Sequence, residues 1–154
     1  MKTLVIYDSM FGNTKKIAQA IGESFGNGAQ VFHISKTKSD DLTSADMLII
    51  GSPTHGGQPS QKMKEFLNTI APNSLNGIKT AAFDTGISVD GQKHFMRFII
   101  RFFGYAAKRL AKILKSKGAN IVSAETFFVL GKEGPLKDGE LDRATEWAKD
   151  ISNN

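Results

Sequence analysis

Hydroxyl, amide and glycine residues are concentrated in the stretch Ser9-Met10-Phe11-Gly12-Asn13-Thr14, which lies between a short apolar run and a helical pattern. The first turn of a helix carries backbone N–H groups without partners in the helix, and it lies at the positive end of the helix dipole. Such a turn attracts anions. Ser9, Asn13 and Thr14 can add side-chain donors. The stretch therefore predicts a phosphate-binding loop, while an ordinary helix cap is the plainer interpretation of the same residue types.

Two further stretches of this kind follow predicted strands. Ser52 to Pro59 follows the apolar run Met47 to Ile50, and Asp84 to Ile87 follows the strand predicted at Ile78 to Phe83. Ligands of open parallel sheets bind outside the carboxyl ends of the strands. The three stretches together therefore favour a phosphate-bearing ligand. Neither the Walker loop nor the dinucleotide pattern G-x-G-x-x-G is present, so ATP and NAD are disfavoured as ligands.

The elements that must position these loops alternate between strand and helix along the whole chain. The continuous apolar run at Met47 to Ile50 is typical of a strand buried on both faces. Alternation of this kind predicts right-handed crossovers and a parallel sheet covered on both faces. We therefore expect one α/β domain over residues 1–154, a three-layer doubly wound fold with five parallel strands. The remaining predicted strands lie near Leu4 to Ile6, Ala29 to Ser35 and Asn120 to Leu130, the last one bent near Ser123.

Composition limits the chemistry that side chains can supply. The 154 residues include no Cys and only 3 His, so thiol nucleophiles, disulfides and a thiolate or histidine metal centre are disfavoured. Redox chemistry would have to come from a cofactor. No apolar run approaches the ~20 residues of a membrane span, and the N-terminus lacks the pattern of an export signal. A cytoplasmic protein is expected.

The positive charge is concentrated in one segment. Although the net charge is +5, the segment from Gly91 to Ala124 holds eight basic residues and no acidic residue, and the rest of the chain is net acidic. One helix from Phe95 to Lys117 would place most of the basic residues on one arc and the apolar residues on the other, with Gly104 as a point where it could break. A solvated basic face of a crossover helix is the plainer interpretation.

Three pieces in chain order resemble the short-chain flavodoxin family. They are the Ser9 to Thr14 loop, the Gly51 to Gly57 loop, and the run from Phe102-Phe103-Gly104 to Val122. The resemblance covers nearly the whole chain. It implies strand order 2-1-3-4-5 with FMN at the point where the winding reverses, an arrangement for which flavodoxins are themselves the standard example.

By this resemblance the cofactor does the chemistry, and no side chain is assigned as acid, base or nucleophile. The first loop would hold the FMN phosphate, the second would line one side of the flavin ring, and the third would approach the other side. His55 stands where many flavodoxins stack a Trp, and Gly56 stands where a carbonyl turns toward the flavin N5 on reduction. The implied cofactor-binding residues are Ser9, Met10, Phe11, Gly12, Asn13, Thr14, Pro53, Thr54, His55, Gly56, Gly57, Asp84, Thr85 and Gly86.

The third loop departs from the family pattern. It lacks the usual Gly-Asp pair and the covering Tyr, and an apparent insertion from Ile87 to about Ile100 follows it. The apolar residues Phe95 to Ile100 fit a lid on the flavin, a docking surface for a redox partner, or a contact with anionic membrane. A lid combined with a docking surface is favoured. Nucleic acid is disfavoured because no binding motif accompanies the charge.

The expected function is that of a flavoprotein in electron transport, exchanging electrons with a redox partner protein. The partner is expected to present an acidic surface to Arg97, Arg101 and Lys108. One alternative is a flavin-dependent oxidoreductase acting on a small apolar substrate such as a quinone or porphyrinogen, with Phe95 to Ile100 as substrate or membrane contact. Another alternative is a flavin-free module of the same fold.

Overall fold

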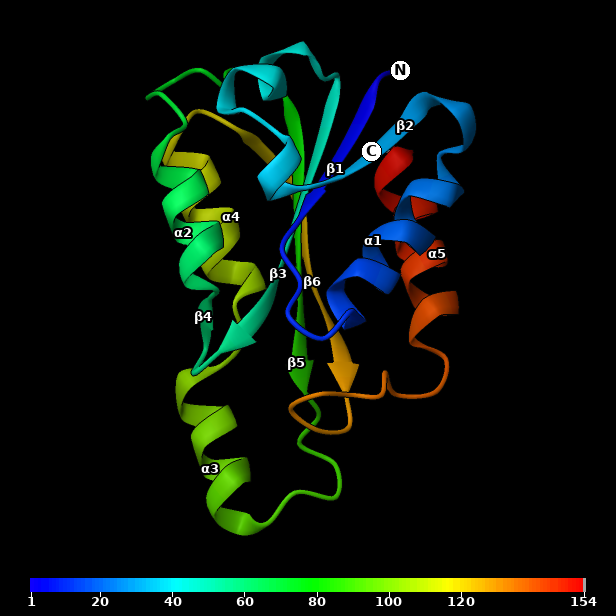
Figure 1. The fold of residues 1–154 in the computed structure, drawn as a ribbon, viewed down its shortest axis with the longest axis vertical. Coiled ribbons are helices and arrows are strands. Elements are labelled where there is room, and N and C mark those ends of the chain that lie inside the picture. The colour runs from blue at the N-terminus through cyan, green and yellow to red at the C-terminus, as the bar shows by residue number, and fades with distance from the viewer. Residues whose placement is uncertain (154) are drawn as a thin grey trace.

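A twisted parallel sheet forms the centre of the protein in the computed structural model, which describes residues 1–153 (Figure 1). The sheet order is β2-β1-β3-β5-β6, with the short β4 paired to β3 in the antiparallel direction. The five parallel strands match the predicted order 2-1-3-4-5, which is confirmed. The strands are β1 (Thr3–Tyr7), β2 (Ala29–His33), β3 (Met47–His55), β4 (Gln58–Pro59), β5 (Lys79–Ile87) and β6 (Asn120–Val129).

Two hydrophobic clusters hold helices against opposite faces of this sheet. Every residue of β1 is buried, as expected for a central strand covered on both faces. One cluster includes Leu67 of α2 and Leu110 of α4, and the other includes Ile17 of α1 and Trp147 of α5. The helices are α1 (Asn13–Ser24), α2 (Gln61–Asn68), α3 (His94–Phe103), α4 (Ala107–Ser116) and α5 (Glu140–Ser152), with 3-10 turns at Gly26–Gly28, Ile34–Lys36 and Ser39–Ser44.

Local signals in the sequence account for several boundaries. The Ser60 hydroxyl accepts a hydrogen bond from the Met63 N–H at 3.2 Å, so Ser60 caps α2, as its residue type favours. The bend predicted near Ser123 is a β-bulge, because the pairing between β5 and β6 skips Val122. The bulge shifts the register near the start of β6, and the pairing then continues to Ile87 and Val129 at the carboxyl ends of the two strands.

Two strand boundaries and one helix differ from the predictions. β3 extends to His55 and β5 extends to Ile87, so both strands continue into stretches that were predicted to be loops. The predicted helix from Phe95 to Lys117 is two helices, α3 and α4, interrupted at Gly104, whose φ is 69°. Glycine adopts this left-handed backbone conformation without the penalty other residues carry, which explains why the break falls there.

Candidate functional site

The loop between β1 and α1 closes over its own backbone amides. The hydroxyl oxygen of Ser9 accepts hydrogen bonds from the N–H groups of Gly12 at 3.1 Å and Lys15 at 3.4 Å. Gly12 has a φ of 91°, which brings the chain into the helix through a left-handed turn. The Ser9 hydroxyl oxygen thus accepts from backbone N–H groups at the N-terminus of α1 to which an anion would also bind. Rotation of the Ser9 side chain would free these N–H groups for an anion.

The side chains of Asn13 and Thr14 point into the protein rather than to solvent. The Thr14 hydroxyl lies 2.8 Å from the Thr85 hydroxyl of β5, and both residues are buried. The Asn13 amide nitrogen donates to the carbonyl of Glu133, at 3.1 Å, in the segment after β6. These contacts fix the first turn of α1 against the carboxyl ends of β5 and β6, so the predicted phosphate loop lies where the resemblance implies.

A tight hairpin forms the second predicted loop. His55 pairs with Gln58, and the two residues between them, Gly56 and Gly57, have φ values of 54° and 75°. Two consecutive positive φ angles define a type I′ turn, for which glycine is strongly favoured. His55 and Gly56 are exposed, whereas Gly57 is buried.

The side chain of Arg109, from α4, is hydrogen-bonded to this hairpin. One guanidinium nitrogen, Nη1, donates to the carbonyl of Gly57 at 2.6 Å and to the carbonyl of Phe103 at 2.8 Å. The turn is therefore connected directly to the last residue of α3. Arg109 is one of the eight basic residues between Gly91 and Ala124, and no local pattern in the sequence predicts this contact.

The prediction that Asp84, Thr85 and Gly86 form a loop is wrong. They lie within β5 and continue its parallel pairing with β6. Asp84 is fully buried, and its carboxylate accepts hydrogen bonds from the hydroxyls of Thr54 and Thr126 and from the backbone N–H of Ala106. Burial raises the pKa of Asp84 above its ordinary value, and the hydrogen bonds to the carboxylate offset only part of this rise.

Alternation along β5 separates the roles of these three residues. Asp84 contacts the α4 side of the sheet through Ala106, whereas Thr85 contacts the α1 side through Thr14. Gly86 lies against the ring of Tyr105, where an added Cβ would come within 2.4 Å of a ring atom. Of the three, only Thr85 lines the cavity described next. Contacts of Asp84 and Gly86 with a cofactor remain predictions.

A cavity of about 80 Å³ opens where the carboxyl ends of β3, β5 and β6 meet the loop before α1. Apolar side chains and polar groups both line it, and the loop residues Met10 and Phe11 keep 60% and 45% of their surface exposed beside it. Ile87, Val129 and Lys132 line it although they were not predicted. The complete lining is Met10, Phe11, Asn13, Thr54, His55, Thr85, Ile87, Val129 and Lys132.

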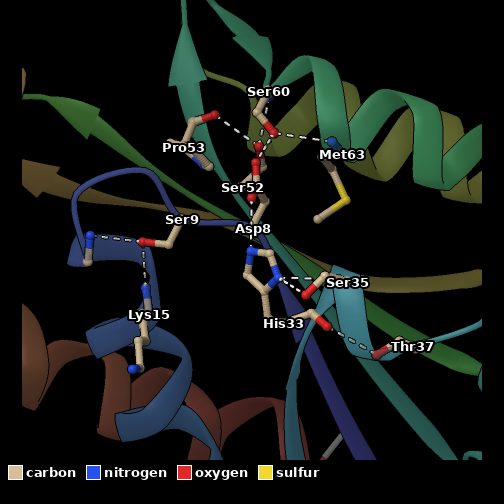
Figure 2. A network of polar contacts seen from close by, with 11 residues as sticks. Asp8, Ser9, Lys15, His33, Ser35, Thr37, Ser52, Pro53, Ser60 and Met63 are labelled. Atoms are coloured by element: carbon tan, nitrogen blue, oxygen red, sulfur yellow. Dashed lines mark hydrogen bonds and ion pairs between the residues drawn. The ribbon is translucent and has the colours of Figure 1, made fainter.

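A larger groove of about 480 Å³ lies on the other side of Met10 and His55. A polar network lies beside this groove and includes two of its lining residues, Asp8 and Ser60 (Figure 2). The Asp8 carboxylate accepts from the Ser60 hydroxyl at 2.5 Å and lies 3.2 Å from Nε2 of His33. These contacts join the ends of β1 and β2 to the start of α2, and they fix the position of Asp8 next to the first loop.

The lining of the two hollows fits an amphipathic ligand with an anionic group. Exposed apolar side chains, Met10 and Phe11, lie next to the backbone donors of the α1 N-terminus, and the Lys132 side chain adds a cation to the cavity wall. An aromatic ring against the apolar side chains and a phosphate at the helix N-terminus satisfy both parts. No group of three or more metal-ligating side chains exists within residues 1–153.

The comparisons with known proteins agree with this geometry. The chain is 40% identical over 73 residues to a flavodoxin of Aquifex aeolicus, a match that covers 45% of this chain and 40% of that protein. It is 30% identical over 122 residues to flavodoxin 1 of Escherichia coli K12, covering 78% of this chain and 65% of that protein. The matched regions thus span between two fifths and two thirds of the lengths of these relatives.

A solved flavodoxin from the domain Archaea has the same fold. The two structures superpose with a TM-score of 0.77 over 99% of this chain and 97% of the archaeal chain, at 23% sequence identity. The sequence model of the flavodoxin family matches residues 5–147, nearly the whole chain. By this match, the chain belongs to the flavodoxin family.

Proposed function

We propose that this chain binds FMN across the cavity and the larger groove, which share Met10 and His55 as lining residues, and exchanges electrons with a redox partner protein. The observation that carries the proposal is the meeting of apolar side chains, helix N-terminal amides and Lys132 at the carboxyl ends of the strands. FMN is the cofactor of the flavodoxin family to which the chain belongs. When bound, it supplies one- and two-electron redox chemistry that no side chain here can perform.

The protein's own residues bind and orient the cofactor in this proposal. The backbone amides of Ser9 to Thr14 hold the phosphate, and the hydroxyl of Thr14 stays anchored to Thr85. Pro53 to Gly57 border the flavin ring, with exposed His55 beside the cavity. Arg109 holds the carbonyl of Gly57, whereas the space beside the Cα of Gly56 is open, so the peptide between the two glycines has the greater freedom to rotate in this proposal.

Titration of the purified protein with FMN, followed by flavin fluorescence, tests cofactor binding. Asn13→Ala should weaken binding by about 1 kcal/mol or more, roughly fivefold in Kd, because it removes the hydrogen bond to Glu133 that fixes the first turn of α1, whose backbone amides hold the phosphate. Thr14→Ala should do the same. Thr145→Ala, which removes a comparable hydroxyl from α5, is the matched control and should leave the Kd unchanged. A protein that takes up no FMN would refute the proposal.

The electron-transfer partner is proposed to dock through an acidic surface on Arg97, Arg101 and Lys108. Arg101 and Lys108 are exposed, and the segment that contains all three has no acidic residue. Charge complementarity of this kind accelerates association and makes it dependent on salt. The charge of this surface is consistent with the proposed docking role. The location of the protein in the cytoplasm is a separate prediction.

Stopped-flow reduction of the FMN-loaded protein by a reduced acidic [2Fe–2S] ferredoxin tests the docking surface. Arg101→Glu combined with Lys108→Glu should slow the second-order rate by about tenfold or more at low salt, because two attractive charges become repulsive. The difference should shrink as salt increases. Lys149→Glu on α5 is the control, because Lys149 is exposed outside the basic segment. An equal rate in the double variant would remove this docking surface.

The enzyme alternative gains no support from the structure. It used Phe95 to Ile100 as a substrate or membrane contact, and none of these residues lines the cavity where a substrate would meet the flavin. A lid on the cavity is unsupported for the same reason.

A further inference from the structure

Helix α3 leaves much of its apolar surface uncovered within the described chain, with Ile99 and Ile100 only half-buried. None of its ten residues, His94–Phe103, is buried, whereas α2, α4, α1 and α5 all bury residues against the sheet. Figure 1 shows α3 extending past the ends of β3 and β5. Most helices in globular proteins are stabilised by packing an apolar face, so this face is available for a contact outside the chain.

Three phenylalanines form a continuous ridge on this helix, which we call the aromatic ridge. Phe95, Phe98 and Phe102 expose 74%, 66% and 73% of their surfaces. At ~100° per residue they fall within an arc of about 60°. The rings of Phe98 and Phe102 stack at 6.1 Å between centroids, which joins them into one apolar surface. Exposed apolar patches of this kind mark interaction sites.

Positive charge adjoins the aromatic ridge, and negative charge is absent from the helix. Lys93, Arg97 and Arg101 lie in or next to α3, and no acidic residue occurs between Gly91 and Ala124. The nearest acidic residue before the helix, Asp90, pairs with Lys137 at 2.9 Å. By helical spacing, Arg97 and Arg101 lie on an arc next to the ridge rather than within it.

We propose that α3 docks on the headgroup region of an anionic lipid bilayer, with the aromatic ridge inserted among the acyl chains and the adjacent basic residues on the lipid phosphates. An aromatic arc beside a basic arc is the pattern of helices that lie in a membrane interface. Lipid phosphates complement a helix that carries only positive charge. No helix within residues 1–153 is long and apolar enough to cross a bilayer, so this contact is peripheral.

A bilayer fits the ridge better than a protein surface does. Transient electron-transfer contacts are small and about as polar as the rest of a protein surface, so they would use the basic arc and leave three phenylalanines in water. The ridge projects on a helix beyond the sheet, and a deformable lipid surface can enclose it from several sides. Arg97 and Arg101 belong to both proposed contacts, so lipid and an acidic partner would compete for them, whereas Lys108 on α4 lies outside the ridge. The inference does not depend on FMN.

Flotation of the full chain with lipid vesicles tests the proposal. At low salt the protein should float with phosphatidylcholine vesicles that contain phosphatidylglycerol, and only weakly with pure phosphatidylcholine. Replacement of all three ridge residues, Phe95→Ser, Phe98→Ser and Phe102→Ser, should reduce partitioning by about tenfold or more. Leu141→Ser removes an apolar side chain that is 44% exposed on α5 and should leave partitioning unchanged.

A charge variant and a fluorescent variant complete the test. Arg97→Gln combined with Arg101→Gln should weaken binding to anionic vesicles but not the weak binding to pure phosphatidylcholine. The decrease in binding should be similar to the decrease that added salt causes in the wild type. Phe98→Trp, which alters only an exposed position, should show a blue shift of tryptophan emission when anionic vesicles are added. The existing Trp147 is 8% exposed and serves as a constant background.

Several results would overturn the proposal. The wild type could fail to float with anionic vesicles, or the triple serine variant could float equally well. A concentration-dependent dimer that the triple variant abolishes would assign the ridge to a second copy of this chain. Binding to immobilised acidic ferredoxin that needs the ridge, without vesicle binding, would assign it to a protein partner.

Discussion

Alanine substitutions at the two glycines of the β3–β4 turn should have unequal effects on stability. Both residues have positive φ values, 54° at Gly56 and 75° at Gly57, so both alanines incur the left-handed backbone penalty of about 1 kcal/mol. An added Cβ at Gly56 would meet no atom within 4 Å. At Gly57 it would lie 2.5 Å from the carbonyl oxygen and 2.9 Å from the carbonyl carbon of Phe103.

The Cβ added at Gly57 would meet backbone atoms of Phe103, which cannot rotate away as a flexible side chain can. Insertion of one carbon into such a packed position costs about 1–3 kcal/mol beyond the penalty shared with Gly56. A shift of Phe103 would also disturb the two hydrogen bonds from Arg109. We therefore expect Gly56→Ala to lower the free energy of unfolding by about 1 kcal/mol and Gly57→Ala by about 2–4 kcal/mol.

Urea denaturation of the protein without FMN measures both values. With the slope m unchanged, the shift in midpoint gives the change in the free energy of unfolding. Because the two substitutions are identical and adjacent, Gly56→Ala controls for the effect of alanine on the unfolded chain. Equal destabilisation by both would refute the packing of the turn against the end of α3.

Two further substitutions test buried charges. The raised pKa of Asp84 means that the folded protein holds this proton more tightly than the unfolded chain, so the free energy of unfolding should fall as pH rises from about 3.8 through the folded pKa. Asp84→Asn should lose that decline, and urea titrations from acid to neutral pH measure it; an unchanged profile would contradict the assignment. Arg143→Met should lower the free energy of unfolding by about 1–3 kcal/mol, since it leaves buried Glu140 without the guanidinium nitrogen now 2.6 Å away. Lys149→Met, at an exposed position, should stay within about 0.5 kcal/mol of the wild type.

The fold could be predicted from the sequence because its central strands carry an unambiguous signal. Runs such as Met47 to Ile50 are apolar at every position, and a short run of this kind that ends at glycine and proline is typical of a strand covered on both faces. Helix ends were marked by Ser60 and Gly104. Strand order 2-1-3-4-5 came from the resemblance to flavodoxins, not from periodicity.

The end of β5 could not be predicted, because its residue types are those of a turn. Asp84 and Gly86 are both depleted in strands. Asp84 is accommodated because Thr54 and Thr126, from the two neighbouring strands, donate to its carboxylate. Those donors lie far away in sequence, so local patterns contain no trace of them.

The candidate site was predicted in part. Three residues of the first loop, Met10, Phe11 and Asn13, line the cavity together with Thr54, His55 and Thr85, as expected for segments at the carboxyl edge of one sheet. The other predicted residues, Ser9, Gly12, Thr14, Pro53, Gly56, Gly57, Asp84 and Gly86, do not line it. Val129 and Lys132 were missed although the same rule applies to them, because β6 lies beside β5 and its carboxyl end reaches the same edge. Attention to the end of every strand, including one followed by no glycine and hydroxyl cluster, would have found them.

The junction between α3 and α4 ties the exposed helix to the edge of the sheet that carries the candidate site. The N–H of Ala106 donates to Asp84 at 3.0 Å, and Arg109 holds both Phe103 and Gly57 through a single nitrogen. A displacement of Phe103 must therefore lengthen one of the Arg109 hydrogen bonds or carry Gly57 with it. Arg109 therefore joins the end of α3 to the turn beside the cavity through two hydrogen bonds.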